Sequence, residues 1–343
     1  MLQRHSVKPP DIESVFNQSF PTTVSSSPLR FKTILITGSQ GMLGHGLAVA
    51  INSLMVSQNV KGFKVILSSR KWSDTFTSFW EKSPNIVLIN NHQISSLKCQ
   101  VDLVIHTASP SNITQISTFE ELTWANVGLL KEVLKLSPQK IVYISSGEVY
   151  GGGNTDEEIV LNRFSQQQKR DWYPISKLET ENELRAFQLE QEIDVCIIRL
   201  FHTFGPGVKA DDGRSFADIL WGAVLDNQII LKSQGDQVRT FLYLSDALDG
   251  IISLTLNDTP RFLLTNLGSA IPTTIFEFAR LVANISGATV KFEIAKDFQH
   301  SPNKSIVPNM EKMLLTGWNQ KIPLEEGIRR TISWIKGSTL GWK

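Results

Sequence analysis

The 343-residue chain lacks the features that mark several specialised classes of protein. It has only two cysteines, Cys99 and Cys196, both in or beside strand-like runs, so we expect buried thiols in a reducing compartment rather than a disulfide or metal site. A net charge of +1 provides no basic field for nucleic acid. Apolar runs such as Val101–Ile105 are far too short to span a membrane. We therefore expect a cytoplasmic protein with neither nucleic acid nor membrane as partner.

A glycine-rich segment follows a short apolar run near the start of the chain. Ile34–Ile36 is typical of a parallel strand that is buried on both faces. Gly38, Gly41 and Gly44 then follow in a G-x-x-G-x-x-G pattern, which permits a tight turn, close approach of a pyrophosphate and close packing of a helix. The pattern predicts a dinucleotide site formed by Gly38, Ser39, Gln40, Gly41, Met42, Leu43 and Gly44.

Helices and strands alternate after this motif. Apolar periodicity predicts helices at His45–Val56, Thr118–Leu136 and Tyr173–Gln191, and strands at Phe63–Leu67, Ile86–Ile89, Val101–His106 and Ile141–Ser145. Such alternation implies an α/β fold of the Rossmann type, with a doubly wound parallel sheet and ligands at the carboxyl ends of its strands. In the helix Thr118–Leu136, we expect one face to pack on the sheet, formed by Trp124, Asn126, Val127, Leu130, Val133 and Leu134.

The remaining chain is expected to form a smaller lobe. The pattern predicts helices at Ser215–Leu225, Ser245–Leu256 with Ser245 as its N-cap, and Thr274–Ser286, and strands at Ile229–Lys232 and Val238–Tyr243. Trp318 and Trp334 are expected to be core residues. We divide the chain into an N-terminal extension (1–30), a dinucleotide-binding domain (31–204) and mainly a substrate-binding lobe (205–343), some segments of which return to the sheet.

The residues after two of the strands bear on the choice of cofactor. Ser69 and Arg70 follow the second strand, where an NAD-specific site usually has an acidic residue. A hydroxyl and a guanidinium suit a 2′-phosphate instead, so we predict NADP, with NAD as the alternative; Arg70 could equally be a solvated surface residue. After the fourth strand, the chain is expected to turn over the cofactor at Thr107, Ala108 and Ser109.

Three polar residues suggest acid–base chemistry. Tyr173 and Lys177 are four residues apart, so on a helix they share one face and the ammonium can lower the pKa of the phenol. Ser146, at the end of a strand, can hydrogen-bond the substrate oxygen while Tyr173 exchanges its proton. The glycine turn, the serine and the Tyr/Lys pair occur in this order along the chain. Together they predict an enzyme that transfers a hydride, and we expect no metal ion in its site.

With these motifs, the chain from Lys32 to about Gly337 resembles the extended short-chain dehydrogenases/reductases of the nucleotide-sugar epimerase/dehydratase family. Further matching segments are Asn126 in Ala-Asn-Val-Gly, Ser145–Gly151, Arg199–Pro206, Arg239–Asp246, Leu315–Trp318 and Leu324–Gly327. The resemblance implies bound NAD(P), the triad Ser146/Tyr173/Lys177, and Asn126 as a helper. It also implies a nucleotide-diphosphate sugar in the C-terminal lobe, with Arg239 at the diphosphate, and a homodimer through parts of Thr118–Leu136 and Ile175–Gln191.

Three positions depart from the family pattern. His202 stands where many relatives have asparagine, so one expected substrate contact is altered; the histidine could be packed or catalytic. Gly147 replaces one member of an acidic pair that is common in sugar 4,6-dehydratases, and leaves only Glu148. The segment Gly205–Arg214 resembles the family's decarboxylases, but Leu178 stands where those usually have an arginine.

Three functions remain open from the sequence. The first is an epimerase, dehydratase or decarboxylase that reduces and reoxidises its cofactor in one turnover. In such an enzyme Glu148 could be the base that removes the C5 proton of a 4-keto sugar, or it could only form hydrogen bonds. The second is an NADPH-dependent reductase of a 4-keto sugar or another small carbonyl, which Ser69 and Arg70 favour. The third is a catalytically silent dinucleotide sensor, which would not need Ser146, Tyr173 and Lys177.

Overall fold

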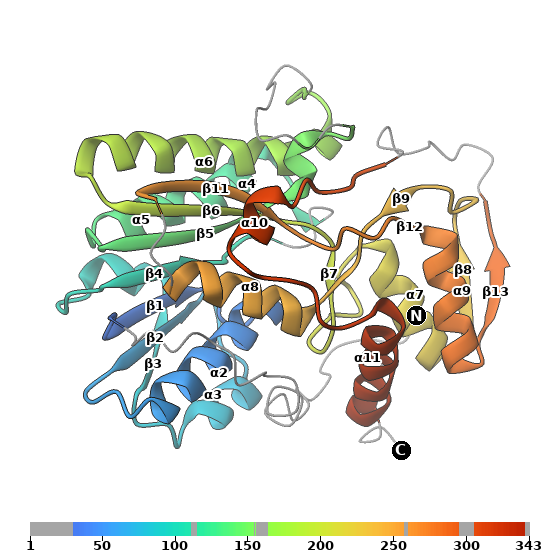
Figure 1. The fold of residues 1–343 in the computed structure, drawn as a ribbon, viewed down its shortest axis with the longest axis horizontal. Helices are drawn as coiled ribbons and strands as arrows, with labels where there is room; N and C mark the ends of the chain where they lie inside the picture. The colour runs from blue at the N-terminus through green and yellow to red at the C-terminus, as the bar shows by residue number, and fades with distance from the viewer. Residues whose placement is uncertain are drawn as a thin grey trace.

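A parallel sheet organises the chain in the computed structural model, which describes residues 30–110, 115–153, 155, 164–256, 260–294 and 305–339. Within these residues the sheet has seven strands in the order β11-β6-β5-β4-β1-β2-β3, and all neighbours are parallel (Figure 1). The expected extension over residues 1–30 lies, except for Arg30, outside the described part. The strands are β1 (Thr33–Thr37), β2 (Lys64–Ser69), β3 (Ile86–Asn90), β4 (Leu103–His106), β5 (Lys140–Ser146), β6 (Asp194–Leu200) and β11 (Phe262–Leu267).

The strands form because their side chains are apolar on both faces. In β1, Ile34 and Ile36 pack on one face and Leu35 on the other, and all three are fully buried. This is the pattern that helices on both sides of a parallel sheet require. The predicted Rossmann-type α/β fold is confirmed, and each predicted strand of the sheet lies within about two residues of the observed one.

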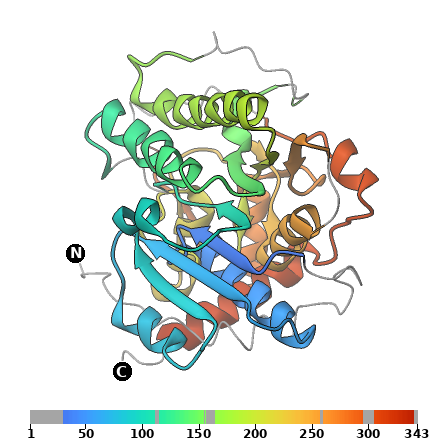
Figure 2. The same cartoon turned by 90° about the vertical axis from the view of Figure 1, so that its left-hand side faces the viewer.

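Helices cover both faces of the sheet (Figure 2). One face packs against α2 (Met42–Ser57), α3 (Asp74–Trp80) and α8 (Leu244–Leu256). The opposite face packs against α5 (Leu129–Leu134) and α6 (Trp172–Gln191), with Leu130 and Leu184 fully buried. Ser245 lies inside α8, which begins at Leu244, so its prediction as an N-cap is wrong. Among the residues described, no helix is long and apolar enough to cross a membrane.

The helix predicted over Thr118–Leu136 is interrupted. It consists of α4 (Phe119–Thr123), a π-helical turn η3 (Trp124–Gly128) and α5. The wider turn breaks the 3.6-residue period, and the side chain of Trp124 is 73% exposed rather than packed on the sheet as expected. Asn126, in the same turn, is buried. The other residues predicted for that face are buried as well, in the turn or in α5.

The second half of the chain forms the lobe at the right of Figure 1 and also returns to the sheet. The lobe core lies among α7 (Ser215–Leu225), α9 (Ile275–Ser286) and α11 (Leu324–Thr339), beside the parallel pair β8 (Gln228–Leu231) and β13 (Thr289–Phe292). Strand β11 pairs with β6, and α10 (Glu311–Leu315) contacts β11. The main sheet therefore has residues from both halves of the chain.

Short strands connect the lobe to the sheet. The predicted strand Val238–Tyr243 is two strands, β9 (Val238–Arg239), which pairs with β12 (Thr273–Thr274), and β10 (Leu242–Tyr243), which pairs with β7 (Thr203–Phe204). The chain changes partner between them at Thr240 and Phe241, which a continuous apolar run does not reveal.

The predicted core residues differ in outcome. Trp318 and Trp334 are buried as expected, and so is the Cys196 thiol on β6. Cys99 is exposed, which contradicts the expectation of two buried thiols, because it lies in the connection between the 3-10 helix η1 (Asn91–Ser96) and β4.

Candidate active site

The glycine turn lies between the ends of β1 and β4. Gly38 has a φ of 68°, and a Cβ there would lie 2.7 Å from the Cα of Ala108. A Cβ at Gly44 would overlap the carbonyl oxygen of Gly38. Glycine is therefore required at both positions, for the left-handed turn and for the close approach of helix to turn. Gly41 donates its backbone N–H to the oxygen of Gly38 at 3.0 Å.

The beginning of α2 is open to an anion. Its N-cap is Gly41, no side chain caps it, and its first turn contains no acidic residue. The exposed backbone N–H groups and the helix dipole at such an end favour a phosphate. Gly207 packs against Met42, with a virtual Cβ 3.2 Å from the Met42 side chain, so the second half of the chain approaches the same turn. These residues fit the pyrophosphate of a dinucleotide.

Hydrogen bonds hold the strand ends around this turn. Thr107 donates its hydroxyl to the oxygen of Thr37 at 2.6 Å, and the backbone N–H of Ala108 donates to the Thr37 hydroxyl at 3.3 Å. Ser39 donates its backbone N–H to Ser68 at 3.1 Å. The ends of β1, β2 and β4 are thus fixed relative to one another beside the predicted phosphate site.

The end of β2 and the residues that follow it, 68–73, include no aspartate or glutamate. Ser69 donates its hydroxyl to the oxygen of Lys71 at 2.8 Å, and Arg70 is exposed. The backbone N–H of Ser73 donates to Oε1 of Gln40 at 3.3 Å, which connects this segment to the glycine turn. Arg70 therefore directly follows β2, where the ribose of the predicted cofactor is expected, and its side chain is accessible to solvent.

Tyr173 and Lys177 lie on the first turns of α6, next to the end of β5. The hydroxyl of Ser146 interacts with the phenol of Tyr173. Lys177 is buried and donates from Nζ to the oxygen of Ile144 at 3.0 Å. Its Nζ is 5.7 Å from the centre of the Tyr173 ring. The structure therefore brings together the serine, tyrosine and lysine predicted from the sequence.

The charge state of this group differs from the expectation. Burial raises the pKa of Tyr173, although Arg214 and the hydroxyl of Ser146 oppose the increase. Burial also lowers the pKa of Lys177 to about 7, against the attraction of Glu181. The pKa of Tyr173 is therefore raised rather than lowered, because desolvation of its phenol outweighs the nearby positive charge of Arg214.

Asn126 faces α6 from the π-helical turn η3. Its Nδ2 donates to the hydroxyl of Ser176 at 2.9 Å, and Ser176 donates to the oxygen of Tyr173 at 2.9 Å. The Oδ1 of Asn126 is buried and has no hydrogen-bond partner among the described residues. The side chain is thus fixed beside the start of α6, with one acceptor that an incoming donor could satisfy.

A second cluster of charged residues surrounds Glu148, in the 3-10 helix η4 (Gly147–Tyr150) directly after β5. The Glu148 side chain is 38% exposed, and its Oε1 lies 3.8 Å from Nε2 of His202. Desolvation raises the pKa of Glu148, while Arg239 and Arg214 oppose the increase. Burial, helped by the same two arginines, lowers the pKa of His202 to about 3. The histidine is therefore neutral, and the carboxyl group is poised to exchange a proton.

Arg214 is a site residue that the sequence reasoning did not select. It precedes α7 and forms a paired interaction with Asp212, whose Oδ2 accepts from the second guanidinium nitrogen at 2.7 Å. It interacts electrostatically with both Tyr173 and Glu148. The sequence signal for this residue is the segment Gly205–Arg214, which resembles the family's decarboxylases and ends at this arginine.

Packing explains two of the departures from the family pattern. A Cβ at Gly147 would lie 2.8 Å from the ring of Phe201, so the ring occupies the space that a second acidic side chain would need. Leu178 is buried in an apolar cluster with Val149, Tyr150, Phe201 and Ile306. An arginine at position 178 would be buried among these side chains, and leucine is the residue that fits.

The fold and this site define an enzyme of the extended short-chain dehydrogenase/reductase type. The model of the NAD dependent epimerase/dehydratase family matches residues 34–263, and the chain belongs to that family. The comparisons thus support an enzyme of this type and do not favour the reductase or the silent sensor.

Several curated relatives are decarboxylases. The chain is 27% identical over 333 residues to UDP-glucuronic acid decarboxylase 1 of Xenopus tropicalis, covering 95% of this chain and 77% of that protein. It is 26% identical over 324 residues to UDP-glucuronic acid decarboxylase 3 of Arabidopsis thaliana, covering 89% of this chain and 91% of that protein.

Solved structures with other activities share the fold. A Bacillus cereus UDP-glucuronic acid 4-epimerase in complex with UDP-glucuronic acid and NAD has a TM-score of 0.74 at 20% identity, covering 89% of this chain and 99% of that one. A dTDP-glucose 4,6-dehydratase from Streptomyces venezuelae with NAD bound has a TM-score of 0.76 at 17% identity, covering 90% and 98%.

Replacing Tyr173 tests the acid–base role that the site suggests. Tyr173→Phe removes the phenolic proton but keeps the ring, so we expect turnover to fall by roughly 10²–10⁴-fold. Cofactor affinity, measured by fluorescence titration, should remain nearly unchanged. Near-normal turnover in this variant would refute the assignment.

Proposed function

We propose that this protein oxidises C4 of a nucleotide-diphosphate uronic acid with a bound nicotinamide cofactor, and that the 4-keto sugar then loses carbon dioxide at C5. The observation that carries the proposal is the placement of Glu148. Its partly exposed carboxyl group follows Ser146 by two residues, and Arg214 interacts with both Glu148 and Tyr173. One acid–base group for C4 and another for C5 therefore interact with the same arginine.

The residues around Tyr173 suit the first step. When bound, the nicotinamide would accept a hydride from C4 and later return it. Tyr173 would take the proton of the C4 hydroxyl while the Ser146 hydroxyl holds its oxygen. Arg214 and the Ser146 hydroxyl favour the phenolate that this role requires. Lys177, buried beside Tyr173, would support the same anion when protonated.

The residues around Glu148 suit the second step. A carboxylate at C5 is β to the new C4 ketone, so its C–C bond breaks, carbon dioxide leaves and the electron pair passes to the C4 oxygen as an enolate. C5 must then receive a proton. The raised pKa of Glu148 leaves it more often protonated than an ordinary glutamate, and it would donate that proton and recover it from water.

The preference for a uronic acid is supported by charge and by the relatives. The guanidinium groups of Arg214 and Arg239 both interact with Glu148, and Arg214 is also paired with Asp212. Both guanidinium groups suit the recognition of an anionic group on a ligand. The relatives described above are named as UDP-glucuronic acid decarboxylases. Dehydration is the second candidate, because Glu148 could also remove the C5 proton of a neutral 4-keto sugar before water leaves.

The test uses UDP-glucuronic acid and NAD in deuterium oxide, with mass spectrometry and NMR of the product. We expect loss of carbon dioxide and deuterium at C5. In Glu148→Gln, turnover should fall by roughly 10²–10⁴-fold, whereas Glu81→Gln, a change at the exposed residue that follows α3, should not alter it. A product of unchanged mass would favour epimerisation. Unlabelled product at full rate from Glu148→Gln would contradict the role of Glu148.

The preference between NADP and NAD is a separate proposal. The absence of an acid after β2 and the exposure of Arg70 support binding of a 2′-phosphate, whereas the solved neighbours named above contain NAD. We therefore predict that Arg70→Ala weakens NADP(H) binding and leaves NAD(H) binding little changed. Lys71→Ala, at the adjacent exposed residue, is the matched control. Equal losses for the two cofactors in Arg70→Ala would exclude a phosphate contact.

We also propose a homodimer through parts of residues 118–136 and 175–191. Helices α4 and α6 contact each other, and the exposed side chains of Trp124 and Leu189 belong to these two segments. We expect Trp124→Asp to weaken the dimer by desolvating a charge at the interface. Ile271→Asp, at another exposed apolar position, in the lobe, should have no effect. Light scattering at micromolar concentration measures both, and a monomeric parent protein would refute the proposal.

A further inference from the structure

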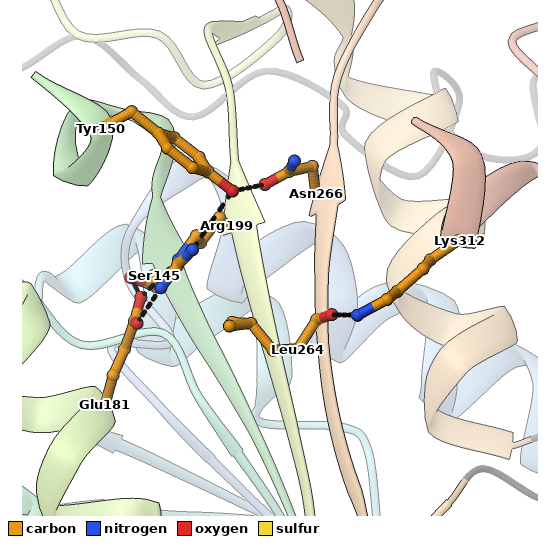
Figure 3. Close-up of polar contacts among 7 residues, drawn as sticks. All are labelled: Ser145, Tyr150, Glu181, Arg199, Leu264, Asn266 and Lys312. Carbon is orange, nitrogen blue, oxygen red and sulfur yellow. Dashed lines mark hydrogen bonds and ion pairs between the residues drawn. The ribbon is translucent and has the colours of Figure 1, made fainter. Parts of the chain in front are cut away.

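A buried ionic network lies behind the active site (Figure 3). Arg199 on β6 forms a two-pronged contact with Glu181 on α6, donating at 3.1 Å and 2.6 Å. Both side chains are less than 8% exposed. Glu181 also accepts the hydroxyl of Ser145 at 2.5 Å.

The network extends across three neighbouring strands in register. Ser145 on β5, Arg199 on β6 and Asn266 on β11 are directly paired residues. Arg199 donates to the hydroxyl of Tyr150 at 3.2 Å, and Tyr150 donates to Oδ1 of Asn266 at 2.7 Å. Tyr150 ends η4, the element that carries Glu148. One guanidinium thus connects α6 to the segment that contains Ser146 and Glu148.

Glu181 is also placed to act on Lys177. The two residues are four apart on α6, so they lie on the same helix face, and both are buried. We infer that Glu181 is a positioning residue, which shares its negative charge between Arg199 and Lys177 and so sets how readily Lys177 holds its proton beside Tyr173. Removal of either charged partner should then change the proton affinity of Lys177, in opposite directions.

The other groups that face Lys177 do not supply this control. Its Nζ is 5.0 Å from the centre of the Tyr143 ring on β5 and 5.7 Å from that of Tyr173. His106 on β4 also interacts with it, but burial and the lysine itself lower the pKa of His106 to about 3, so this ring is neutral. Burial raises the pKa of Tyr143 well above its ordinary value, so its phenol is neutral too. Glu181 is therefore the negative charge that supports protonated Lys177.

The sign of the pH effect follows from linkage. The pKa of Lys177 is about 7 in the folded protein and 10.5 in a solvated lysine. The unfolded chain therefore binds more protons between these values, and the free energy of unfolding rises with pH across this window. We expect Glu181→Gln to lower the folded-state pKa of Lys177 further. The free energy of unfolding would then be reduced at low pH, and this reduction would disappear at high pH, where Lys177 is neutral in both folded proteins.

The experiment measures the free energy of unfolding of the ligand-free protein by urea denaturation between pH 6 and pH 9. We expect the stability deficit of Glu181→Gln, relative to the parent, to shrink as pH rises through 7. The deficit of Arg199→Gln should instead grow with pH, because an unneutralised Glu181 holds the Lys177 proton more tightly. Glu190→Gln, at an exposed residue of the same helix, is the matched control and should show no pH-dependent deficit.

A second measurement follows the pH profile of kcat. The inference depends on the proposed function only for the catalytic use of Lys177. The pH at which kcat declines on the alkaline side should fall by about one unit in Glu181→Gln, the size of effect that a nearby charge produces. Glu181→Asp keeps the charge, so its pH profile of kcat should lie close to that of the parent.

These outcomes separate the inference from the proposed function. Stability deficits that do not vary with pH in both variants would overturn the inference, because a merely structural pair predicts that result. If Glu181→Gln does not fold, the slope for Arg199→Gln decides the question alone. Failure of the parent to convert UDP-glucuronic acid would refute the proposed function and would leave the unfolding measurement intact.

Discussion

The buried contact between Arg199 and Glu181 is the interaction on which the geometry of the candidate site depends. It joins the helix that carries Tyr173 and Lys177 to β6. Glu181 also accepts the hydroxyl of Ser145 on β5, the strand that leads to Ser146 and Glu148. A desolvated pair of this kind adds little net stability by itself, but removing one partner costs about 3–5 kcal/mol because a buried charge remains uncompensated. The pair therefore imposes one relative placement of α6 and η4, and with it the separation of the two acid–base groups.

Desolvation then determines how these groups titrate. It raises the pKa of Tyr173 and Glu148 and lowers that of Lys177 and His202, while Arg214 acts against the change at both acidic groups. Tyrosine and glutamate are consequently both closer to their neutral forms than they would be in water. A site in which a single arginine interacts with two proton-exchanging groups suits a reaction that moves charge from C4 to C5 of one sugar.

Much of the fold could be predicted because local rules decide it. The apolar runs of β1 to β5 and the glycines at 38, 41 and 44 specify a parallel sheet and a phosphate turn from short stretches of sequence. The order of Ser146, Tyr173 and Lys177 likewise indicated one site, since strand ends in such sheets gather ligands at one edge.

Other features depend on contacts between distant segments. The exposure of Trp124 follows from a π-helical turn, and the glycine at position 147 follows from the ring of Phe201. The guanidinium group of Arg214 is held in place by its contact with Asp212. The network of Ser145, Glu181, Arg199 and Asn266 joins three strands and a helix, and no spacing in the sequence shows that these residues meet.

The proposed function gives Tyr173 and Glu148 separate roles, in hydride transfer at C4 and in proton exchange at C5. Rapid mixing of UDP-glucuronic acid with the cofactor-loaded protein, followed through the absorbance of reduced nicotinamide, tests it most directly. We expect a transient signal in the parent, an accumulated signal in Glu148→Gln and almost none in Tyr173→Phe. Identical traces from the two variants, or no reduced nicotinamide in any of the three proteins, would contradict it.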